Sequence, residues 1–299
     1  MIDVVLVIVA FKSAVDLPRL LDSVPDALGS LSWHALVVDN YGQDNVADSL
    51  ASRPHVTVVS SGSNLGYSGG LNIGLSSSPS SRFTVFLNPD VVLLPGSLSQ
   101  LVRACSVDGV AAAVPVVIDE EGVTQPSLRR EPSALGALGE ALFGDHWPGR
   151  PTWLAEMIRD PRAYRLTHDA EWATGAALAV RSDVLRAIGP WDSHRFFLYS
   201  EETDYCRRIR ALGHRISFSP EAVVRHRGAG SGSSPELNAL MAINKVRYFR
   251  KWHGSAASAL FACITVVHSA LRLGRPESRL TIQALFSAPA RAALPGGSA

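Results

Sequence analysis

The feature that most constrains the fold is a repeated alternation between short apolar segments and segments with helical apolar spacing. Residues 2–11 are an almost unbroken Val, Ile and Leu run, which is typical of a parallel strand buried on both faces. Residues 15–28 follow with helical spacing. The alternation then continues, with expected strands at 35–38, 56–59, 83–87 and 110–117 and expected helices at 45–51 and 70–75. This pattern predicts an α/β fold with a Rossmann-like, mostly parallel central sheet and helices on both faces.

The second half of the chain is less regular. A stretch broken by Pro and Gly, residues 119–165, is expected to be a mobile insertion. Order resumes at 171–180, with expected helices near 182–188 and 202–212, a short strand at 215–218, and a helical end. We therefore expect one domain over residues 1–231, with halves at 1–117 and 171–231, followed by a helical C-terminal region at 232–299.

The composition limits the function classes. The chain has 28 Lys and Arg against 27 Asp and Glu, so no global field draws it to nucleic acid, and we expect no nucleic-acid partner. Its three cysteines, Cys105, Cys206 and Cys263, lack C-x-x-C spacing and are interpreted as packing residues in a reducing compartment. The first residues carry no basic segment of a signal peptide. These features predict a cytoplasmic protein.

The longest apolar run, residues 256–271, is shorter than the roughly 20 residues that a membrane-spanning helix needs. Basic and aromatic residues flank it at 247–252, and arginines follow at Arg272, Arg275 and Arg279. Two interpretations stay open: a packed C-terminal helix, or a peripheral contact with a membrane surface.

Polar residues that directly follow apolar strands are the first candidates for a site, because ligands of open α/β sheets bind beyond the carboxyl ends of the strands. Such positions are Asp39, Asn64, Asp90 and His226. In the Phe86–Asp90 segment, the proline before Asp90 has a fixed φ angle and so stiffens the backbone that carries the carboxylate. A divalent ion that bridges a diphosphate needs only one or two protein carboxylates, so Asp90 is the candidate metal ligand.

A glycine-rich segment at 64–74 leads into a helix, where glycines permit close backbone approach and a helix N-terminus favours anions. The same segment contains G-x-S-x-G around Ser68. With Asp192 or Asp204 and then His226, the order fits an α/β-hydrolase triad, which is an alternative function. The expected strand at 56–59 ends well before Ser68, whereas a nucleophile elbow places its serine directly at a strand end.

An aromatic and acidic block at 196–208 opens an expected helix and contains Glu201, Glu202 and Asp204. Aromatic bulk around a carboxyl group tends to raise its pKa toward values that suit a general base. His226 lies between Arg225 and Arg227, in a cationic cluster suited to a diphosphate.

Together and in this order, these motifs resemble glycosyltransferase family 2, and within it the bacterial rhamnosyltransferase-like branch. The segment 64–74 is similar to the family's N-x-G-x-x-x-G-x-N-x-G element, and Asn88-Pro89-Asp90 to its D-x-D motif. The remaining matches are 174–181, 189–192, 196–208, His226 and Ser231. The resemblance spans residues 2–231.

The resemblance implies a GT-A fold, an inverting mechanism and Mg²⁺ or Mn²⁺. It implies that residues 1–117 bind the nucleotide-sugar and that residues 171–231 form the acceptor and catalytic half. Glu202 takes the place of the catalytic base, with Glu201 as the open alternative, and Asp90 and His226 hold the metal. The implied donor-binding residues are Phe11, Asp39, Asn64, Gly66, Gly70, Asn72, Asn88 and Asp90. The implied acceptor-binding residues are Trp172, Gly175, Trp191 and Asp192.

The resemblance also favours rhamnose from dTDP-rhamnose as the transferred sugar. The acceptor is expected to be a glycan, a lipid-linked sugar or a small-molecule scaffold, in cell-envelope polysaccharide or natural-product glycoside biosynthesis. A non-catalytic module that only binds a nucleotide-sugar is a further alternative.

Overall fold

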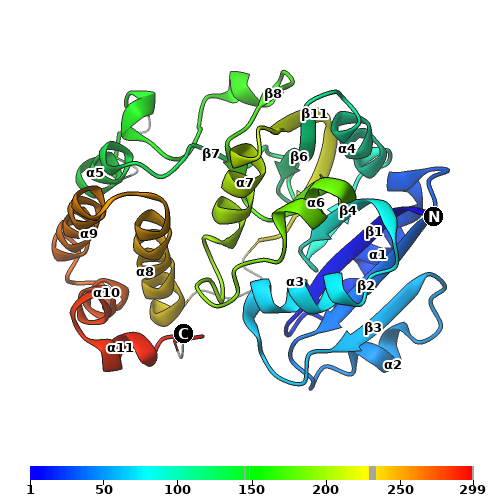
Figure 1. Ribbon diagram of the computed structural model, residues 1–299, viewed down its shortest axis with the longest axis horizontal. Helices are drawn as coiled ribbons and strands as arrows, with labels where there is room; N and C mark the ends of the chain where they lie inside the picture. Colours follow the sequence, from blue (N-terminus) through cyan, green and yellow to red (C-terminus); the bar gives the residue numbers. More distant parts are fainter. Residues whose placement is uncertain (145, 148, 229–233, 298–299) are drawn as a thin grey trace.

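The protein is built on one large mixed sheet, shown in the computed structural model of Figure 1, which describes residues 1–144, 146–147, 149–228 and 234–297. The strands follow the order β3-β2-β1-β4-β10-β6-β11-β5, and β8 pairs with β11. A separate two-stranded sheet joins β7 and β9. The strand bounds are β1 (Ile2–Ala10), β2 (Trp33–Asp39), β3 (Val56–Ser60), β4 (Ser81–Leu87), β5 (Val91–Leu93), β6 (Val110–Ile118), β7 (Leu128–Arg129), β8 (His168–Asp169), β9 (Trp172–Ala173), β10 (Ala177–Arg181) and β11 (Arg215–His226).

The predicted α/β class is confirmed, and the sheet has two parallel parts. Strands β1, β2, β3 and β4 pair in parallel, and so do β6 and β11. Strand β10 runs antiparallel between β4 and β6, which makes the sheet mixed. The antiparallel direction of β10 was not predicted, because an apolar run such as 177–180 looks the same in a parallel and in an antiparallel strand.

Strand β11 is longer than the strand expected at 215–218. Its pairing with β6 shifts between Ser219 and Val223 and then continues to Ile118. Pro220 lies in this interruption and has no amide hydrogen for the ladder. Because of this irregularity, the apolar pattern did not predict the second half of β11. This half places His226 at the edge of the sheet, beside β5.

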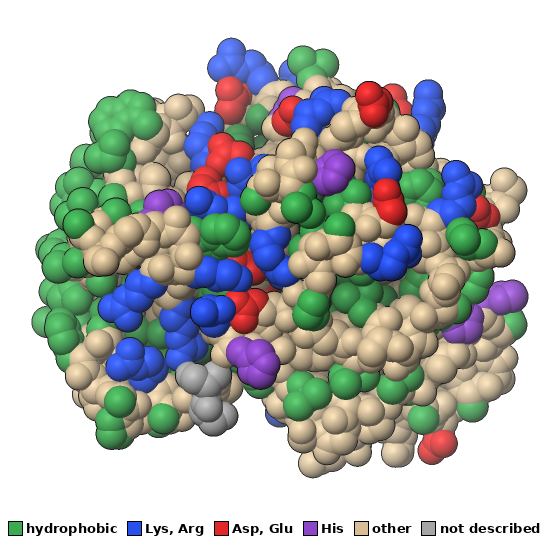
Figure 2. Space-filling view, in the orientation of Figure 1, with side chains coloured by type: hydrophobic (Ala, Val, Ile, Leu, Met, Phe, Trp, Pro, Cys, Tyr) green, Lys and Arg blue, Asp and Glu red, His purple; other side chains and the backbone are tan. Residues whose placement is uncertain are grey.

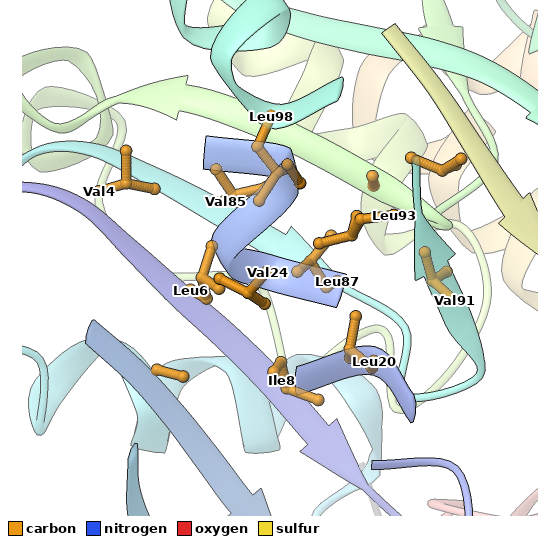
Figure 3. Close-up of a cluster of buried hydrophobic side chains, with 14 of the residues drawn as sticks. Val4, Leu6, Ile8, Leu20, Val24, Val85, Leu87, Val91, Leu93 and Leu98 are labelled. Atoms are coloured by element: carbon orange, nitrogen blue, oxygen red, sulfur yellow. The ribbon is translucent and has the colours of Figure 1, made fainter. Parts of the chain in front are cut away.

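Helices cover both faces of the sheet and bury an apolar core on each. Alternate residues of β1 divide between the faces: Val4, Leu6 and Ile8 belong to one cluster, and the residues between them to the other. The first cluster lies under α1 (Leu17–Leu28) and α4 (Ser97–Cys105), and Figure 3 shows part of it. The second cluster lies under α3 (Gly66–Ser76), α6 (Ser182–Ile188) and α7 (Glu201–Ala211). The short α2 (Val46–Leu50) packs beside β3.

The C-terminal helices form a body beside the sheet (Figure 1). They are α8 (Pro235–Trp252), α9 (Ser255–Ala270), α10 (Pro276–Phe286) and α11 (Ala288–Ala292). Among the described residues, no helix is both long enough and apolar enough to cross a membrane.

The stretch 119–165 contains β7, α5 (Ala134–Phe143) and two short 3₁₀ turns, Thr152–Leu154 and Pro161–Tyr164. Helix α5 packs against α9, so this stretch contacts the C-terminal body. Its mobility stays a prediction. The expected domain boundary at 231, with Ser231, lies outside the described residues.

Candidate active site

Asp90 and His226 meet at the edge of the sheet. Asp90 follows β4 and directly precedes β5, and β5 pairs antiparallel with the end of β11, with His226 opposite Val91. This pairing places His226 Nε2 3.1 Å from Asp90 Oδ1. The side-chain nitrogen of Asn88 lies 3.4 Å from the same His226 nitrogen. The structure therefore brings together three of the residues expected at the metal and donor site.

The donor set of this corner fits a divalent ion. Asp90 is 9% exposed, and its Oδ2 is buried without a hydrogen-bond partner in the described part of the chain. Burial alone would raise the pKa of Asp90, but the hydrogen bond from His226 and the charges of His226 and Arg227 lower it, so the carboxylate is available as a ligand. Within the described ranges, no group of three or more His, Cys, Asp or Glu side chains could hold an ion. Asp90 and His226 alone are a small set of ligands, which suits an ion whose remaining ligands are phosphate oxygens and water.

Two adjacent carboxyl groups open α7, but they differ in exposure. Glu201 is 2% exposed, whereas Glu202 is half-buried. Burial raises the pKa of Glu202 to about 7, and burial together with the charge of Glu202 raises the pKa of Glu201 well above its usual range. A carboxyl group that titrates near neutral pH and is still accessible suits a general base. Glu202 meets both conditions, whereas the buried Glu201 is not accessible.

Gly175 lies against the Glu202 carboxylate. A Cβ atom at this position would collide with Glu202 Oε1. The absence of a side chain there leaves room for the carboxylate, so Gly175 lies beside Glu202; its expected role in acceptor binding stays a prediction.

Tyr67 is a residue of the site that the sequence reasoning missed. Burial raises the pKa of its phenol well above the usual range, and the nearby charges of Glu202, Glu201 and Asp90 add to the effect. The Tyr67 phenol is therefore close enough to all three carboxylates for their charges to act on it. The only sequence signal was its place inside the glycine-rich element at 64–74.

The glycine-rich element is bound to the rest of the protein at its start. The amides of Leu65 and Gly66 donate to the side chains of Asn40 and Asn64, at 3.0 Å each. The amide of Tyr67 donates to the carbonyl of Phe197 at 2.8 Å. These amides are therefore not free for an anion, contrary to the expectation for this helix N-terminus.

The later glycines of the element serve helix packing. A Cβ atom on Gly70 would lie 2.7 Å from Val9, and one on Gly74 would lie 2.5 Å from Val7. Both glycines let α3 approach β1 closely. Contact with the sheet accounts for Gly70, and its expected contact with the donor stays a prediction.

Asn72 also has a different partner from the one expected. Its Oδ1 accepts from the amide of Trp191 at 2.9 Å, and its Nδ2 donates to the carbonyl of Trp191 at 3.0 Å. Because both ends of the amide are bound to this backbone, Asn72 holds the 189–192 turn rather than the donor.

The ends of β1 and β2 carry a small polar and aromatic cluster. Asp39 Oδ1 accepts from the amides of Tyr41 and Gly42 at 3.1 and 2.8 Å. The rings of Phe11 and Tyr41 meet edge to face with centroids 5.2 Å apart, and Lys12 Nζ lies 5.3 Å from the centroid of Tyr41. Phe11 and Asp39 are therefore neighbours, as expected for one binding subsite.

The expected acceptor residues lie at different depths. Trp191 is 2% exposed and stacks on Tyr205 with centroids 4.0 Å apart, so its ring is part of the core. Trp172 is 9% exposed, and its indole donates to the carbonyl of Arg130 at 2.8 Å. Asp192 pairs with Lys251 at 2.7 Å and with Arg195 at 2.8 Å. Among these three, the burial of Trp191 contradicts a direct contact with an acceptor.

Helix α8 supports the turn that carries the carboxylates. Tyr199 and Ser200 have φ values of 70° and 68°, a conformation that costs side-chain-bearing residues energy. Asn244, 0% exposed, donates to the carbonyl of Leu198 at 2.8 Å and to that of Tyr199 at 3.4 Å. Arg247 donates to Asn244 Oδ1 at 3.0 Å, which orients the amide toward the turn.

The third acidic residue of α7 is satisfied by cations. Asp204, 1% exposed, lies 2.8 Å from Lys251 Nζ and 3.1 Å from Arg208 Nε. The indole of Trp252 donates to it at 2.9 Å. Asp204 is therefore a structural anchor between α7 and α8.

The hydrolase alternative fails on geometry. Ser68 lies inside α3 rather than at the end of a strand, and it is 0% exposed. Its hydroxyl has no hydrogen-bond partner among the residues that the structure describes, so no histidine there activates it. His226 instead contacts Asp90.

Comparisons with known proteins agree with this geometry. A sequence model of the family described as "Glycosyl transferase family 2" matches residues 5–187. The chain is 29% identical over 225 residues to N-acetylglucosaminyl-diphospho-decaprenol L-rhamnosyltransferase of two Mycobacterium tuberculosis strains, CDC 1551 / Oshkosh and ATCC 25618 / H37Rv, covering 71% of this chain and 72% of that protein. It is 24% identical over 212 residues to the low-salt glycan biosynthesis hexosyltransferase Agl10 of Haloferax volcanii, covering 70% of this chain and 62% of that protein.

A solved structure supports the fold assignment. The structure of GalNAc-T7 with UDP, GalNAc and Mn²⁺ superposes with a TM-score of 0.62 at 15% identity. The match covers 93% of this chain, and the chain spans 55% of the length of that structure. The expected GT-A fold is confirmed.

Proposed function

From the premise that this chain belongs to glycosyltransferase family 2, we propose that it transfers rhamnose from a nucleotide-diphosphate donor to an acceptor hydroxyl with inversion at the anomeric carbon. The family makes it a glycosyltransferase that uses a nucleotide-sugar. The sugar, the stereochemistry and the acceptor are our proposals. The observation that carries the mechanism is the half-buried Glu202, whose carboxylate lies against Gly175 and whose pKa is raised to about 7.

In the proposed reaction, the Glu202 carboxylate takes the proton from the acceptor hydroxyl as its oxygen bonds to the anomeric carbon of the donor sugar. The bond from that carbon to the diphosphate oxygen breaks, and the nucleoside diphosphate leaves with the electron pair. Attack on the face opposite the leaving group inverts the centre. Gly175 leaves space at the carboxylate, and the charges of Glu202 and Asp90 both act on the nearby Tyr67 phenol.

Asp90 and His226, with Asn88 beside them, are the residues that would hold Mg²⁺ or Mn²⁺. A divalent ion bound there would supply charge neutralisation for the departing diphosphate. Arg227, which pairs with Asp16 at 2.9 Å, and Arg225 place further positive charge near this corner. At the ends of β1 and β2, Phe11, Tyr41 and Asp39 form the subsite that we assign to the nucleotide base.

The mycobacterial relative supports rhamnose and a lipid-linked acceptor, because its name describes L-rhamnosyl transfer to N-acetylglucosaminyl-diphospho-decaprenol. We propose dTDP-rhamnose as the donor and an acceptor of this lipid-linked class for the present chain. A role in cell-envelope polysaccharide biosynthesis is the corresponding pathway proposal.

The test is a donor screen followed by turnover. The protein is heated with a panel of nucleotide-sugars with and without Mn²⁺, because a ligand that binds the native state raises its melting temperature. We expect stabilisation by dTDP-rhamnose in the presence of Mn²⁺, and release of dTDP when a short-chain GlcNAc-diphospho-lipid is added. Metal-independent transfer would contradict the role of Asp90. Binding without turnover with any acceptor class would favour the non-catalytic module.

A further inference from the structure

Helix α9 presents an apolar face to the outside of the molecule as well as to its core. Ser258, Phe261 and Ile264 face inward and are buried. The residues that we call the α9 stripe lie on the outside, at helical spacing: Leu260, Cys263, Val267 and Leu271. Leu260, Val267 and Leu271 are 54%, 45% and 61% exposed. A surface helix normally carries charged residues on its solvent side, yet the sequence of α9 contains no Asp, Glu, Lys or Arg.

Helix α5 widens this apolar surface. It packs beside α9 and exposes Leu135 and Leu142, at 53% and 55%. Figure 2 shows hydrophobic side chains covering the edge of the molecule where α5 and α9 lie. An exposed apolar surface that extends over two helices marks an interaction site more often than isolated exposed residues do.

Positive charge is concentrated in the same region. Residues 234–297 carry eight Lys and Arg against two Asp and Glu, although the whole chain has 28 against 27. Arg250 precedes α9, and Arg275 and Arg279 follow it, all exposed. In the described part of the chain, none of these three arginines forms an ion pair. Their charge is therefore available to an external anion.

We propose that the α9 stripe, with Leu135 and Leu142 of α5, docks the protein on an anionic lipid bilayer, with the flanking arginines at the phosphate headgroups. Apolar side chains along α9 and basic residues before and after it match the two layers of a membrane interface. A second copy of this chain fits less well, because a symmetric contact would bring the same positive charges together. The docking does not depend on the proposed function. Its use, bringing a lipid-linked acceptor to Glu202, does rest on that function.

Vesicle sedimentation tests the proposal with the full chain and no sugar donor. Vesicles of pure phosphatidylcholine are compared with vesicles in which about a third of the lipid is phosphatidylglycerol. We expect binding to the anionic vesicles that weakens as salt rises. A stripe variant, Leu260→Ser with Val267→Ser and Leu271→Ser, should bind them at least about tenfold more weakly. An arginine variant, Arg275→Ser with Arg279→Ser, should lose affinity and part of the salt dependence.

The control variant carries serine at three exposed apolar positions outside α5 and α9, Val123, Leu166 and Leu212. It should bind like the wild type, and all variants should melt within a few degrees of it because the replaced side chains are exposed. The proposal is overturned if the wild type ignores anionic vesicles, or if the stripe variant binds them as the wild type does. It is also overturned if the wild type dimerises in solution and the stripe variant does not.

Activity separates this proposal from the proposed function. With a short-chain acceptor that is soluble without a membrane, the stripe variant should turn over at the wild-type rate. If the proposed function is wrong, no form of the protein transfers sugar to that acceptor, and vesicle binding is unaffected.

Discussion

Replacing each carboxyl of the Glu201-Glu202 pair by the isosteric amide should separate their roles. Glu202 is half-buried with a pKa of about 7, so at pH 8 it is mostly ionised and able to accept a proton. The pKa of Glu201 is raised well above its usual range by burial and by the charge of Glu202, and its side chain is only 2% exposed. Glu202→Gln therefore removes the proposed base, whereas Glu201→Gln changes a buried carboxyl and keeps its shape.

The magnitudes follow from these assignments. Loss of a general base typically lowers the rate by about 10² to 10⁴-fold, and we expect Glu202→Gln to fall in this range. Glu201→Gln should keep the rate within about threefold of the wild type, because a side chain that is 2% exposed does not reach an acceptor hydroxyl and the amide keeps its shape. For the wild type, a base with a pKa of about 7 is about one-tenth ionised at pH 6, so kcat should fall about tenfold from pH 8 to pH 6.

The raised pKa of Glu202 also makes the stability of the folded protein depend on pH. Its value rises from 4.5 for an ordinary Glu to about 7 for Glu202 in the folded protein, so the native state holds an extra proton between these pH values. The wild type should therefore lose stability as pH rises from about 4.5 to 7, by about 2–3 kcal/mol from this group. Glu202→Gln cannot lose that proton, and it should melt several degrees above the wild type at pH 8 and near it at pH 4.5.

The assay is release of nucleoside diphosphate under saturating donor and acceptor, from pH 5.5 to 9, with calorimetric melting of the same samples. Donor affinity serves as the control and should be unchanged in both variants. A Glu201→Gln variant as slow as Glu202→Gln would refute the assignment of roles. A rate independent of pH between 6 and 8, with chemistry rate-limiting, would refute the pKa argument.

Three further changes test other parts of the site. Asp90→Asn keeps the shape of the side chain but removes its charge, so titration calorimetry should find Mn²⁺-dependent donor affinity lowered at least about tenfold; unchanged affinity would exclude Asp90 as a ligand. Asn244→Ala removes the hydrogen bond to the turn before Glu201, so it should lower kcat about 10- to 100-fold and shift the acidic limb of the pH profile. Donor affinity should stay constant, and Asn238→Ala on the same helix is the matched control. Gly74→Val should destabilise the fold by about 1–3 kcal/mol in denaturant titration, because its side chain would collide with β1, and it should leave the pH profile unchanged.

The parts of the fold that follow from local sequence were predictable. Strands β1, β2, β3 and β4 are continuous apolar segments, and the carboxylate after β4 stood out because a polar residue ended an apolar run. The direction of β10, the length of β11 and the existence of β5 depend on pairing between distant segments. Local patterns cannot encode such pairing, and the interruption at Pro220 concealed the rest of β11.

Some site residues could likewise be predicted from local sequence, and others depend on contacts between distant segments. Asp90 and His226 were singled out from residue type and position, and they are in contact. Glu202 was assigned from the family resemblance, and its role as the base stays a prediction. The partners of Asn72 and Gly70 were not predictable. An Asn next to glycines reads as a ligand contact, whereas here its amide completes the hydrogen bonds of a turn 119 residues away. Binding the backbone of a turn requires the same residue types as binding a ligand, so the sequence alone does not separate a structural Asn from a ligand-binding one.

The contacts of α8 connect the C-terminal helices to the catalytic turn. The strained turn at Tyr199 and Ser200 is held by Asn244, and the buried charge of Asp204 at the start of α7 is paired with Lys251. Without α8, Asp204 would keep only Arg208 as a charged partner, and a buried carboxylate with less compensation is costly. Because Glu202 lies between the strained turn and Asp204, its position depends on both supports. We infer that α8 is part of the catalytic architecture, while the outer helices α5 and α9 remain free to contact a membrane.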